Sequence, residues 1–237
     1  MKKLIALYLV IAIGTLSLVN HALSAYNRAS DSYIRDRVVL LRGNEGGCTG
    51  IQIKAPSGKD YILSAGHCRD LASFGIMKAI TEDGKEFIVK VVKIDVQHDL
   101  LLLSNNFNHK HVQIADEVYL HEKIHTITHG GEFPSYRTDG ELLEERTLDV
   151  TGDPILTPED WDACPMTPYS APTMTLYGIR CVRKLKLHIS TAYVIPCSSG
   201  GPAVDSRGRL IGIVSCSHEL FSGLVPLHDI KDFLKDM

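Results

Sequence analysis

The most informative stretch of the sequence is Pro196-Cys197-Ser198-Ser199-Gly200-Gly201-Pro202-Ala203-Val204, which places two serines in a tight glycine turn before an apolar segment. Glycines let the backbone approach another molecule closely, so main-chain N–H groups near the serines can meet a developing negative charge. A serine hydroxyl is a weak nucleophile until an imidazole accepts its proton, and a carboxylate must orient that imidazole. A nucleophilic role for this turn therefore requires a histidine and an acid from elsewhere in the chain.

Two other stretches provide candidates for those groups. Leu63-Ser64-Ala65-Gly66-His67-Cys68 places a histidine directly after an apolar segment. Gln97-His98-Asp99-Leu100-Leu101-Leu102-Leu103 places an acid before a run that is expected to be buried. Each pattern alone is typical of ordinary turns and strand ends. The occurrence of all three in the order histidine, aspartate, serine, each beside a predicted strand, favours a catalytic triad.

The chain around these motifs consists of short segments rich in β-forming residues. From residue 38 onward, apolar runs such as 38–41, 61–63 and 87–92 alternate with breakers of glycine, proline and aspartate. Asp83-Gly84 suits a hairpin turn. Many short strands at this spacing predict an all-β barrel or sandwich.

Two segments depart from the β pattern. Residues 137–177 are acidic and rich in proline, and we expect a long, partly ordered insertion there. Leu227, Ile230, Phe233 and Leu234 recur at helical spacing and predict a short amphipathic C-terminal helix.

The composition is that of a globular protein. The 237 residues carry 25 Lys and Arg against 28 Asp and Glu, a net charge of −3, and 44% are hydrophobic. These values exclude a disordered chain and a collagen-like repeat. Only one apolar run approaches membrane-spanning length, which excludes a polytopic membrane protein. Because no basic block is present, we expect no nucleic-acid surface.

The first 25 residues have the pattern of a secretory signal peptide. Two lysines precede an apolar region at residues 4–19, and Ala22-Leu23-Ser24-Ala25 offers small residues for cleavage after Ser24 or Ala25. The alternative is an uncleaved single-helix membrane anchor. Either pattern predicts an exported protein, secreted or periplasmic, with a short N-terminal extension at residues 26–37.

Export changes how the cysteines are interpreted. An even number outside the cytosol favours disulfides, and six cysteines permit 15 pairings that the sequence alone does not separate. No CxxC pair supports a zinc ribbon or a thioredoxin-like site. The six are Cys48, Cys68, Cys164, Cys181, Cys197 and Cys216.

Together the three motifs resemble those of trypsin-like serine peptidases of the chymotrypsin fold. They are closer to the compact bacterial branch, the HtrA and glutamyl-endopeptidase types, than to digestive trypsins. The histidine stretch is similar to the family's T-A-A-H-C, the aspartate stretch to D-x-x-x-D-L-A-L-L, and the serine stretch to the end of G-D-S-G-G-P. This resemblance selects Asp99 over Asp95 as the acid and Ser199 over Ser198 as the nucleophile.

The resemblance extends from Val38 to the C-terminal helix. It implies an all-β fold of two antiparallel six-stranded β-barrels followed by a short helix, with the triad in the cleft between the barrels. Barrel one would cover residues 38–115 and barrel two residues 116–237, within one peptidase domain at 38–237.

The resemblance also implies the groups that surround the triad. The backbone N–H groups of Cys197 and Ser199 would form the oxyanion hole. The implied disulfides are Cys48–Cys68 beside the histidine, Cys164–Cys181 in the insertion, and Cys197–Cys216 between the serine turn and the pocket wall. The implied substrate pocket comprises Tyr193, Ser215, Cys216, Ser217 and His218, of which His218 is a candidate for recognising an acidic or polar P1 side chain.

Three departures from the family pattern bear on activity. Cys197 stands where the family has a glycine, so strain at this residue is able to misorient an oxyanion donor. Ser198 stands where trypsins have aspartate, and no Ile-Val-Gly-Gly activation site is present. Activity should therefore not depend on a buried ion pair with a new N-terminus, although trimming within residues 26–37 stays open.

A competing motif for zinc chemistry lies at His121-Glu122-Lys123-Ile124-His125, with Glu145 as a potential third ligand. Zinc binding through H-E-x-x-H requires a helix that places both histidines on one face. The residues that follow alternate in a β-branched pattern up to Gly130-Gly131, which favours a strand. In a strand these histidines would lie about 13 Å apart, too far to share one metal.

The leading hypothesis is an exported serine endopeptidase that acts on proteins or peptides through an acyl-enzyme, without cofactor or metal. His67 would act as base and then acid, Asp99 would orient it, and Ser199 would attack. Tyr193 occupies the position of the trypsin pocket floor, so we expect a small or apolar P1 residue rather than Arg or Lys. The alternative is a catalytically impaired binding protein on the same fold, suggested by Cys197.

Overall fold

The computed structural model describes residue 15 and residues 30–43, 46–72, 74–107, 110–131, 134–154, 170–175, 178–217 and 220–237. Side chains are described over the same ranges except 151–154, 170–175 and 178–181. The predicted signal peptide, apart from residue 15, lies outside this part of the chain. Within the described ranges, none of the helices has both the length and the apolar character needed to cross a membrane.

The first barrel is a closed antiparallel sheet of six strands in the order β1-β2-β3-β6-β5-β4. A 3-10 helix, η1 (Gly66–Leu71), follows β3. The strands are β1 (Val38–Arg42), β2 (Gly47–Lys54), β3 (Asp60–Ala65), β4 (Ile76–Thr81), β5 (Glu86–Asp95) and β6 (Leu100–Ser104).

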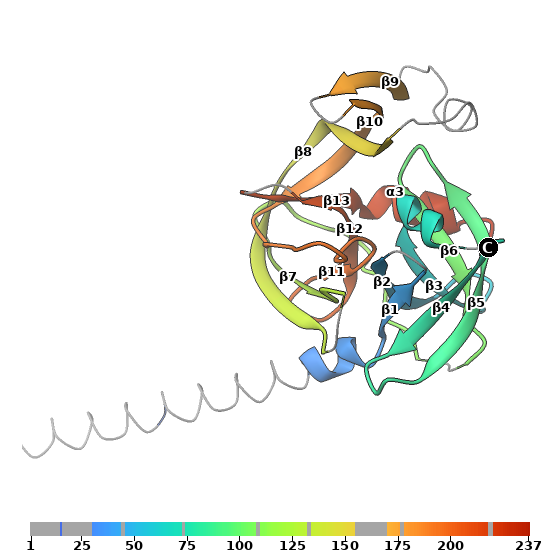
Figure 1. Ribbon diagram of the computed structural model, residues 1–237. Coiled ribbons are helices and arrows are strands. Elements are labelled where there is room, and N and C mark those ends of the chain that lie inside the picture. The colour runs from blue at the N-terminus through green and yellow to red at the C-terminus, as the bar shows by residue number, and fades with distance from the viewer. Residues whose placement is uncertain are drawn as a thin grey trace, which may run out of the picture.

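The second barrel is built from a sheet in the order β13-β12-β11-β7-β8-β10-β9, and an additional β13–β10 pairing closes six of its strands into a ring. The strands are β7 (Lys123–Thr128), β8 (Tyr136–Pro154), β9 (Ser170–Thr175), β10 (Gly178–Ser190), β11 (Pro202–Val204), β12 (Leu210–Ser217) and β13 (Ser222–Pro226). The C-terminal helix α3 (Leu227–Leu234) follows directly. Figure 1 shows β1–β6 gathered on one side of the molecule and the second barrel on the other. The predicted fold class of two β-barrels and a short C-terminal helix is confirmed.

Side-chain alternation along β6 explains how the barrels pack. Leu101 and Leu103 belong to a cluster built from barrel one alone. Leu100 and Leu102 belong to a second cluster that also contains Val225 of β13 and Phe233 of α3. Because successive side chains of a strand point to opposite faces, the four-leucine run fills the first barrel with one face and the barrel interface with the other.

The structure differs from the sequence-based expectation of an insertion at residues 137–177. Its first part is strand β8, which pairs with β7 and over most of its length with β10. The ends of β8 and β10, with β9, extend beyond the barrel at the top of Figure 1. Residues 155–169, which include Cys164, and residues 176–177 lie outside the described residues.

The expected N-terminal extension is also part of the folded domain where it is described. Residues 30–35 are helical. Ile34 is fully buried in the cluster that joins the barrels, together with Val38 and Leu210. The side chain of Arg37 donates to the carbonyl of His111 at 2.8 Å. Packing against barrel one therefore begins before β1.

Candidate active site

His67 and Asp99 form a hydrogen-bonded pair at the barrel interface. His67, in η1 just after β3, places its Nδ1 atom 3.0 Å from Oδ2 of Asp99 and 3.1 Å from Oδ1. The backbone N–H of His67 also donates to Oδ1 at 2.8 Å. Asp99 is only 2% exposed, so water does not compete for these bonds. The carboxylate thus fixes both the position and the orientation of the imidazole.

The charge of Asp99 is maintained despite its burial. Burial by itself raises the pKa of this carboxyl group. The charge of His67 and the hydrogen bonds from His67 and Ser215 outweigh that effect and hold the pKa of Asp99 below its ordinary value. The carboxylate is therefore available to stabilise a positively charged imidazole at neutral pH.

Gly66 allows η1 to lie close to the start of β6. A Cβ atom at residue 66 would lie 2.9 Å from the carbonyl carbon of Asp99 and from the amide nitrogen of Leu100. These are backbone atoms held in β6 and the residue before it, so they have little freedom to move away. The glycine before the histidine is thus required by the close contact between η1 and the start of β6.

The Ser199 turn, residues 195–201, consists of two consecutive tight turns. The N–H of Ser198 donates to the carbonyl of Ile195 at 3.1 Å, and the N–H of Gly201 donates to that of Ser198 at 2.9 Å. A type II turn commonly has proline as its second residue and a residue of positive φ as its third. In the turn at residues 195–198 these are Pro196 and Cys197, and Cys197 has φ 71°. A cysteine therefore adopts the left-handed conformation that favours glycine.

The two glycines of the turn are needed for space. A Cβ atom at Gly200 would lie 2.0 Å from Oγ of Ser64 and 2.1 Å from the carbonyl oxygen of Thr49. At Gly201 it would lie 2.3 Å from Cγ2 of Thr128. The turn is consequently pressed against both barrels, which holds Ser199 at their interface.

Ser199 and Ser198 have different surroundings. The Ser199 hydroxyl is partly exposed and donates to the carbonyl of Ser215 at 3.5 Å. Ser198 is 1% exposed, and its hydroxyl contacts those of Thr128, at 3.1 Å, and Tyr136. Only Ser199 is accessible to a substrate. A neutral hydroxyl network occupies the position where trypsins carry an aspartate.

Ser215 has a contact that sequence analysis did not foresee. It was predicted to line the substrate pocket, but its hydroxyl donates to Oδ2 of Asp99 at 2.5 Å, while its carbonyl accepts from Ser199. One residue of β12 therefore contacts both the acid and the serine. No sequence signal identifies this role, because it depends on the packing of β12 against the start of β6.

The other predicted pocket residues are only partly brought together. Tyr193 is 59% exposed and is not a buried pocket floor. Ser217 is exposed at the end of β12, and His218 lies outside the described residues. Burial raises the pKa of the Cys216 thiol to about 11, so this thiol is neutral at physiological pH.

One of the three predicted disulfides is present and one is wrong. Cys48 and Cys68 are bonded, with their Cα atoms 6.1 Å apart, which confirms the bridge beside His67. Cys197 and Cys216 are free cysteines. The Cys197 sulfur lies near Gly131, whereas the Cys216 sulfur packs against Gly223 on β13, so the two point to different neighbours.

The third predicted disulfide, Cys164–Cys181, falls on residues whose side chains the structure does not describe. It stays a prediction.

The two histidines of the H-E-x-x-H sequence have different surroundings. His125 lies in β7, as the strand pattern predicted, and is buried, whereas His121 is exposed and 3.0 Å from Glu141. Glu145 instead contacts Lys186 and His188 of β10.

One trio of potential metal donors does lie within 4.8 Å, at Cys48, His67 and Cys68. Its two sulfurs are joined in the disulfide, so they are not available as thiolate ligands.

Two closed β-barrels with a buried acid bonded to a partly exposed imidazole, and joined through Ser215 to a serine on a glycine turn, define the chymotrypsin-like class of serine peptidases. A family model described as the trypsin-like peptidase domain matches residues 48–213, more than half of the chain. The chain belongs to this family and is by class a serine endopeptidase that acts on peptides or proteins. None of the curated proteins matches the chain in sequence.

Solved structures with a similar fold come from bacterial proteases. The active form of the Rv3671c protease from M. tuberculosis superposes with a TM-score of 0.65 and 16% identity, over 90% of this chain and 85% of that one. The serine endoprotease from Yersinia pestis superposes with a TM-score of 0.63 and 16% identity, over 89% of this chain and 65% of that one. The HtrA-type protease AlgW with a tripeptide superposes with a TM-score of 0.63 and 18% identity, over 87% of this chain and 62% of that one. At these identities the likeness concerns the fold.

Proposed function

We propose that the protein is an exported serine endopeptidase that works through a His67-Asp99-Ser199 triad and an acyl-enzyme. The observation that carries the proposal is the Asp99 carboxylate, which is bonded to His67 and, through Ser215, connected to the Ser199 turn. A buried, ionised acid behind an imidazole is the arrangement that makes histidine an effective base toward a serine hydroxyl.

In the first half of the reaction, Ser199 attacks the carbonyl carbon of the scissile bond while His67 takes the hydroxyl proton. The resulting imidazolium is stabilised by Asp99, and the oxyanion accepts hydrogen bonds from the N–H groups of Cys197 and Ser199. His67 then gives its proton to the leaving amine, which releases the first product and leaves the acyl group on Ser199. Water, activated by His67, hydrolyses this ester in the second half.

A fluorophosphonate probe tests the nucleophile, because it reacts covalently with an activated serine. We expect Ser199 to be modified in the folded protein, and modification to be lost in Ser199→Ala and strongly reduced in His67→Ala. Ser57→Ala is the matched control, since Ser57 is exposed in the β2–β3 turn and belongs to none of the three motifs. Folded wild type that stays unlabelled would contradict the triad and favour a binding protein on this fold.

Substrate preference and location need separate measurements. We propose a small or apolar P1 residue, because the sequence position at which trypsins carry their acidic pocket floor holds the uncharged Tyr193, and this side chain is itself 59% exposed. A cleavage profile on a peptide library tests this, and a preference for Arg or Lys would contradict it. We propose export through the N-terminal signal, and N-terminal sequencing of the protein recovered outside the cytoplasm tests cleavage after Ser24 or Ala25.

A further inference from the structure

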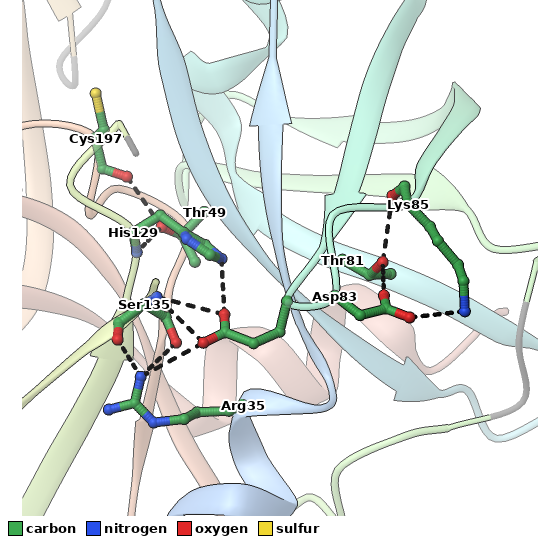
Figure 2. Close-up of polar contacts among 9 residues, drawn as sticks. Arg35, Thr49, Thr81, Asp83, Lys85, His129, Ser135 and Cys197 are labelled. Atoms are coloured by element: carbon green, nitrogen blue, oxygen red, sulfur yellow. Dashed lines mark hydrogen bonds and ion pairs between the residues drawn. The ribbon is translucent and has the colours of Figure 1, made fainter. Parts of the chain in front are cut away.

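Thr49 of β2 holds the Ser199 turn from the opposite barrel. Its backbone N–H donates to the carbonyl of Ser199 at 2.8 Å, and its hydroxyl donates to the carbonyl of Cys197 at 2.9 Å. Thr49 is fully buried, so no water replaces these bonds. A single barrel-one residue therefore fixes the carbonyl groups on both sides of Ser198, as Figure 2 shows for the Cys197 contact.

The direction of the hydroxyl proton is determined by a third partner. The backbone N–H of His129, which directly follows β7, donates to Oγ1 of Thr49 at 2.9 Å. A hydroxyl has one proton, and it cannot be directed at a group that is itself a donor. The Thr49 proton is thus left for the Cys197 carbonyl, which is only an acceptor.

His129 lies beside a carboxylate. Its ring is fully buried, and Nε2 lies 3.9 Å from a carboxylate oxygen of Glu82, in the β4–β5 turn. Glu82 also accepts from the N–H of Ser135 at 3.3 Å and lies 3.7 Å from the guanidinium of Arg35. Figure 2 shows this series of contacts from Arg35 to Cys197. The Thr49 hydroxyl is anchored by its bonds with the His129 N–H and the Cys197 carbonyl and is not free to rotate.

The anchored hydroxyl matters because Cys197 is strained. At φ 71°, a residue with a side chain relaxes when the adjoining peptide rotates toward negative φ. Rotation of the peptide that precedes Cys197 would turn its N–H away from the oxyanion. The hydrogen bond from Thr49 to the Cys197 carbonyl opposes this rotation. It holds the planar peptide that follows Cys197, so the backbone of the turn has less freedom to rearrange around Cys197.

We propose that Thr49 is a positioning residue that keeps the Cys197 N–H directed at the oxyanion through its side-chain hydroxyl. The proposal rests on the proposed function, because it assigns the hydroxyl a role in transition-state stabilisation by that same site. An oxyanion donor acts on the transition state more than on the bound substrate, so its loss lowers kcat with little change in KM.

The matched pair Thr49→Val and Thr49→Ser tests this role. Valine keeps the shape and removes the hydroxyl, whereas serine keeps the hydroxyl. We expect kcat of Thr49→Val to fall by about tenfold or more with KM changed less than about twofold, and Thr49→Ser to retain most of the wild-type kcat. The fluorophosphonate labelling rate should follow kcat in both variants.

A second substitution separates positioning from general destabilisation. If strain at Cys197 drives the loss, Cys197→Gly in the Thr49→Val background removes the strain and should recover part of kcat. If Thr49→Val and Thr49→Ser lose kcat equally, or if Thr49→Val and Thr49→Ala both fail to fold, the hydroxyl has no separate positioning role and the proposal is overturned. Unlabelled wild type would overturn the proposed function, whereas labelled wild type with an equally active Thr49→Val overturns the role of Thr49 alone.

Discussion

Replacing Cys197 by glycine is expected to stabilise the protein. Cys197 has φ 71°, and a residue with a Cβ atom is disfavoured in that region by about 1–2 kcal/mol. Glycine removes this strain but gains unfolded-state entropy, which offsets about 0.4–1 kcal/mol. The net gain is about 1 kcal/mol, which corresponds to a rise in Tm of about 2–4 °C for a domain of this size.

Cys197→Ala is the matched control, because it removes the same thiol and keeps the Cβ atom. The comparison of glycine with alanine isolates the backbone term, since both variants lose the contact of the sulfur with its neighbours near Gly131. Urea unfolding of wild type, Cys197→Gly and Cys197→Ala measures the difference, and a peptide substrate measures turnover. An alanine variant as stable as the glycine variant would refute the reasoning. Turnover of Cys197→Gly should equal or exceed that of wild type.

Three other variants test the site and its support. Ser215→Ala removes the hydroxyl that donates to Asp99 at 2.5 Å and that lowers the pKa of this acid. We expect kcat/KM to fall by about tenfold and its acid limb to move to higher pH, and an unchanged pH profile would contradict this. Replacing Cys48 and Cys68 together by alanine opens a loop with a sequence separation of 20. The free energy of unfolding in urea should then fall by about 3 kcal/mol, whereas a loss below about 1 kcal/mol would argue against the loop-entropy account. Burial lowers the pKa of His125 from 6.5 to about 4. Between pH 6.5 and pH 4 the imidazole is therefore protonated in the unfolded chain but neutral in the folded protein. The contribution of His125 to the free energy of unfolding should be complete above pH 6.5 and fall by about 3 kcal/mol toward pH 4. Urea unfolding measured at a series of pH values should show this fall in the wild type and not in His125→Gln.

The elements that the sequence predicted best are those with a strong apolar pattern. The run Leu100–Leu103 indicated a fully buried strand, and its two faces indeed fill two different clusters. The pairing of His67 with Asp99 followed from motif order and family resemblance, and the structure brings the two side chains together at the interface.

Strand β8 and the first part of β10 were missed for a physical reason, although the run at residues 186–189 of β10 was predicted. β8 carries acidic residues where apolar ones would mark a strand, and β10 carries basic residues opposite, so that Asp149 pairs with Lys184 and Glu145 with His188 in the register. Cross-strand pairs of opposite charge stabilise the outer face of this ribbon, whereas Leu185 and Leu187 of β10 are buried in the core cluster. A single-segment pattern cannot show this, because the partner lies far along the chain.

The predicted pocket stays a prediction, because which side chains line it depends on the register of β12. An irregularity between Val214 and Cys216 in the β12–β13 pairing shifts the side chains that follow it. Such a shift reverses which residues face the barrel interior. Ser215 consequently contacts Asp99, while Cys216 packs beside Gly223 rather than reaching Cys197.

The buried Ile34 sets a boundary for any shortened form of the protein. A chain that starts at β1 would lack this side chain and leave a hole between the two barrels, and loss of a buried isoleucine costs about 2–5 kcal/mol. It would also lack Arg35, the guanidinium partner of Glu82. Recombinant versions for crystallisation or assay should therefore begin no later than residue 29, and a host protease that nicks the chain just before Val38 is expected to yield an unstable remnant instead of a matured enzyme.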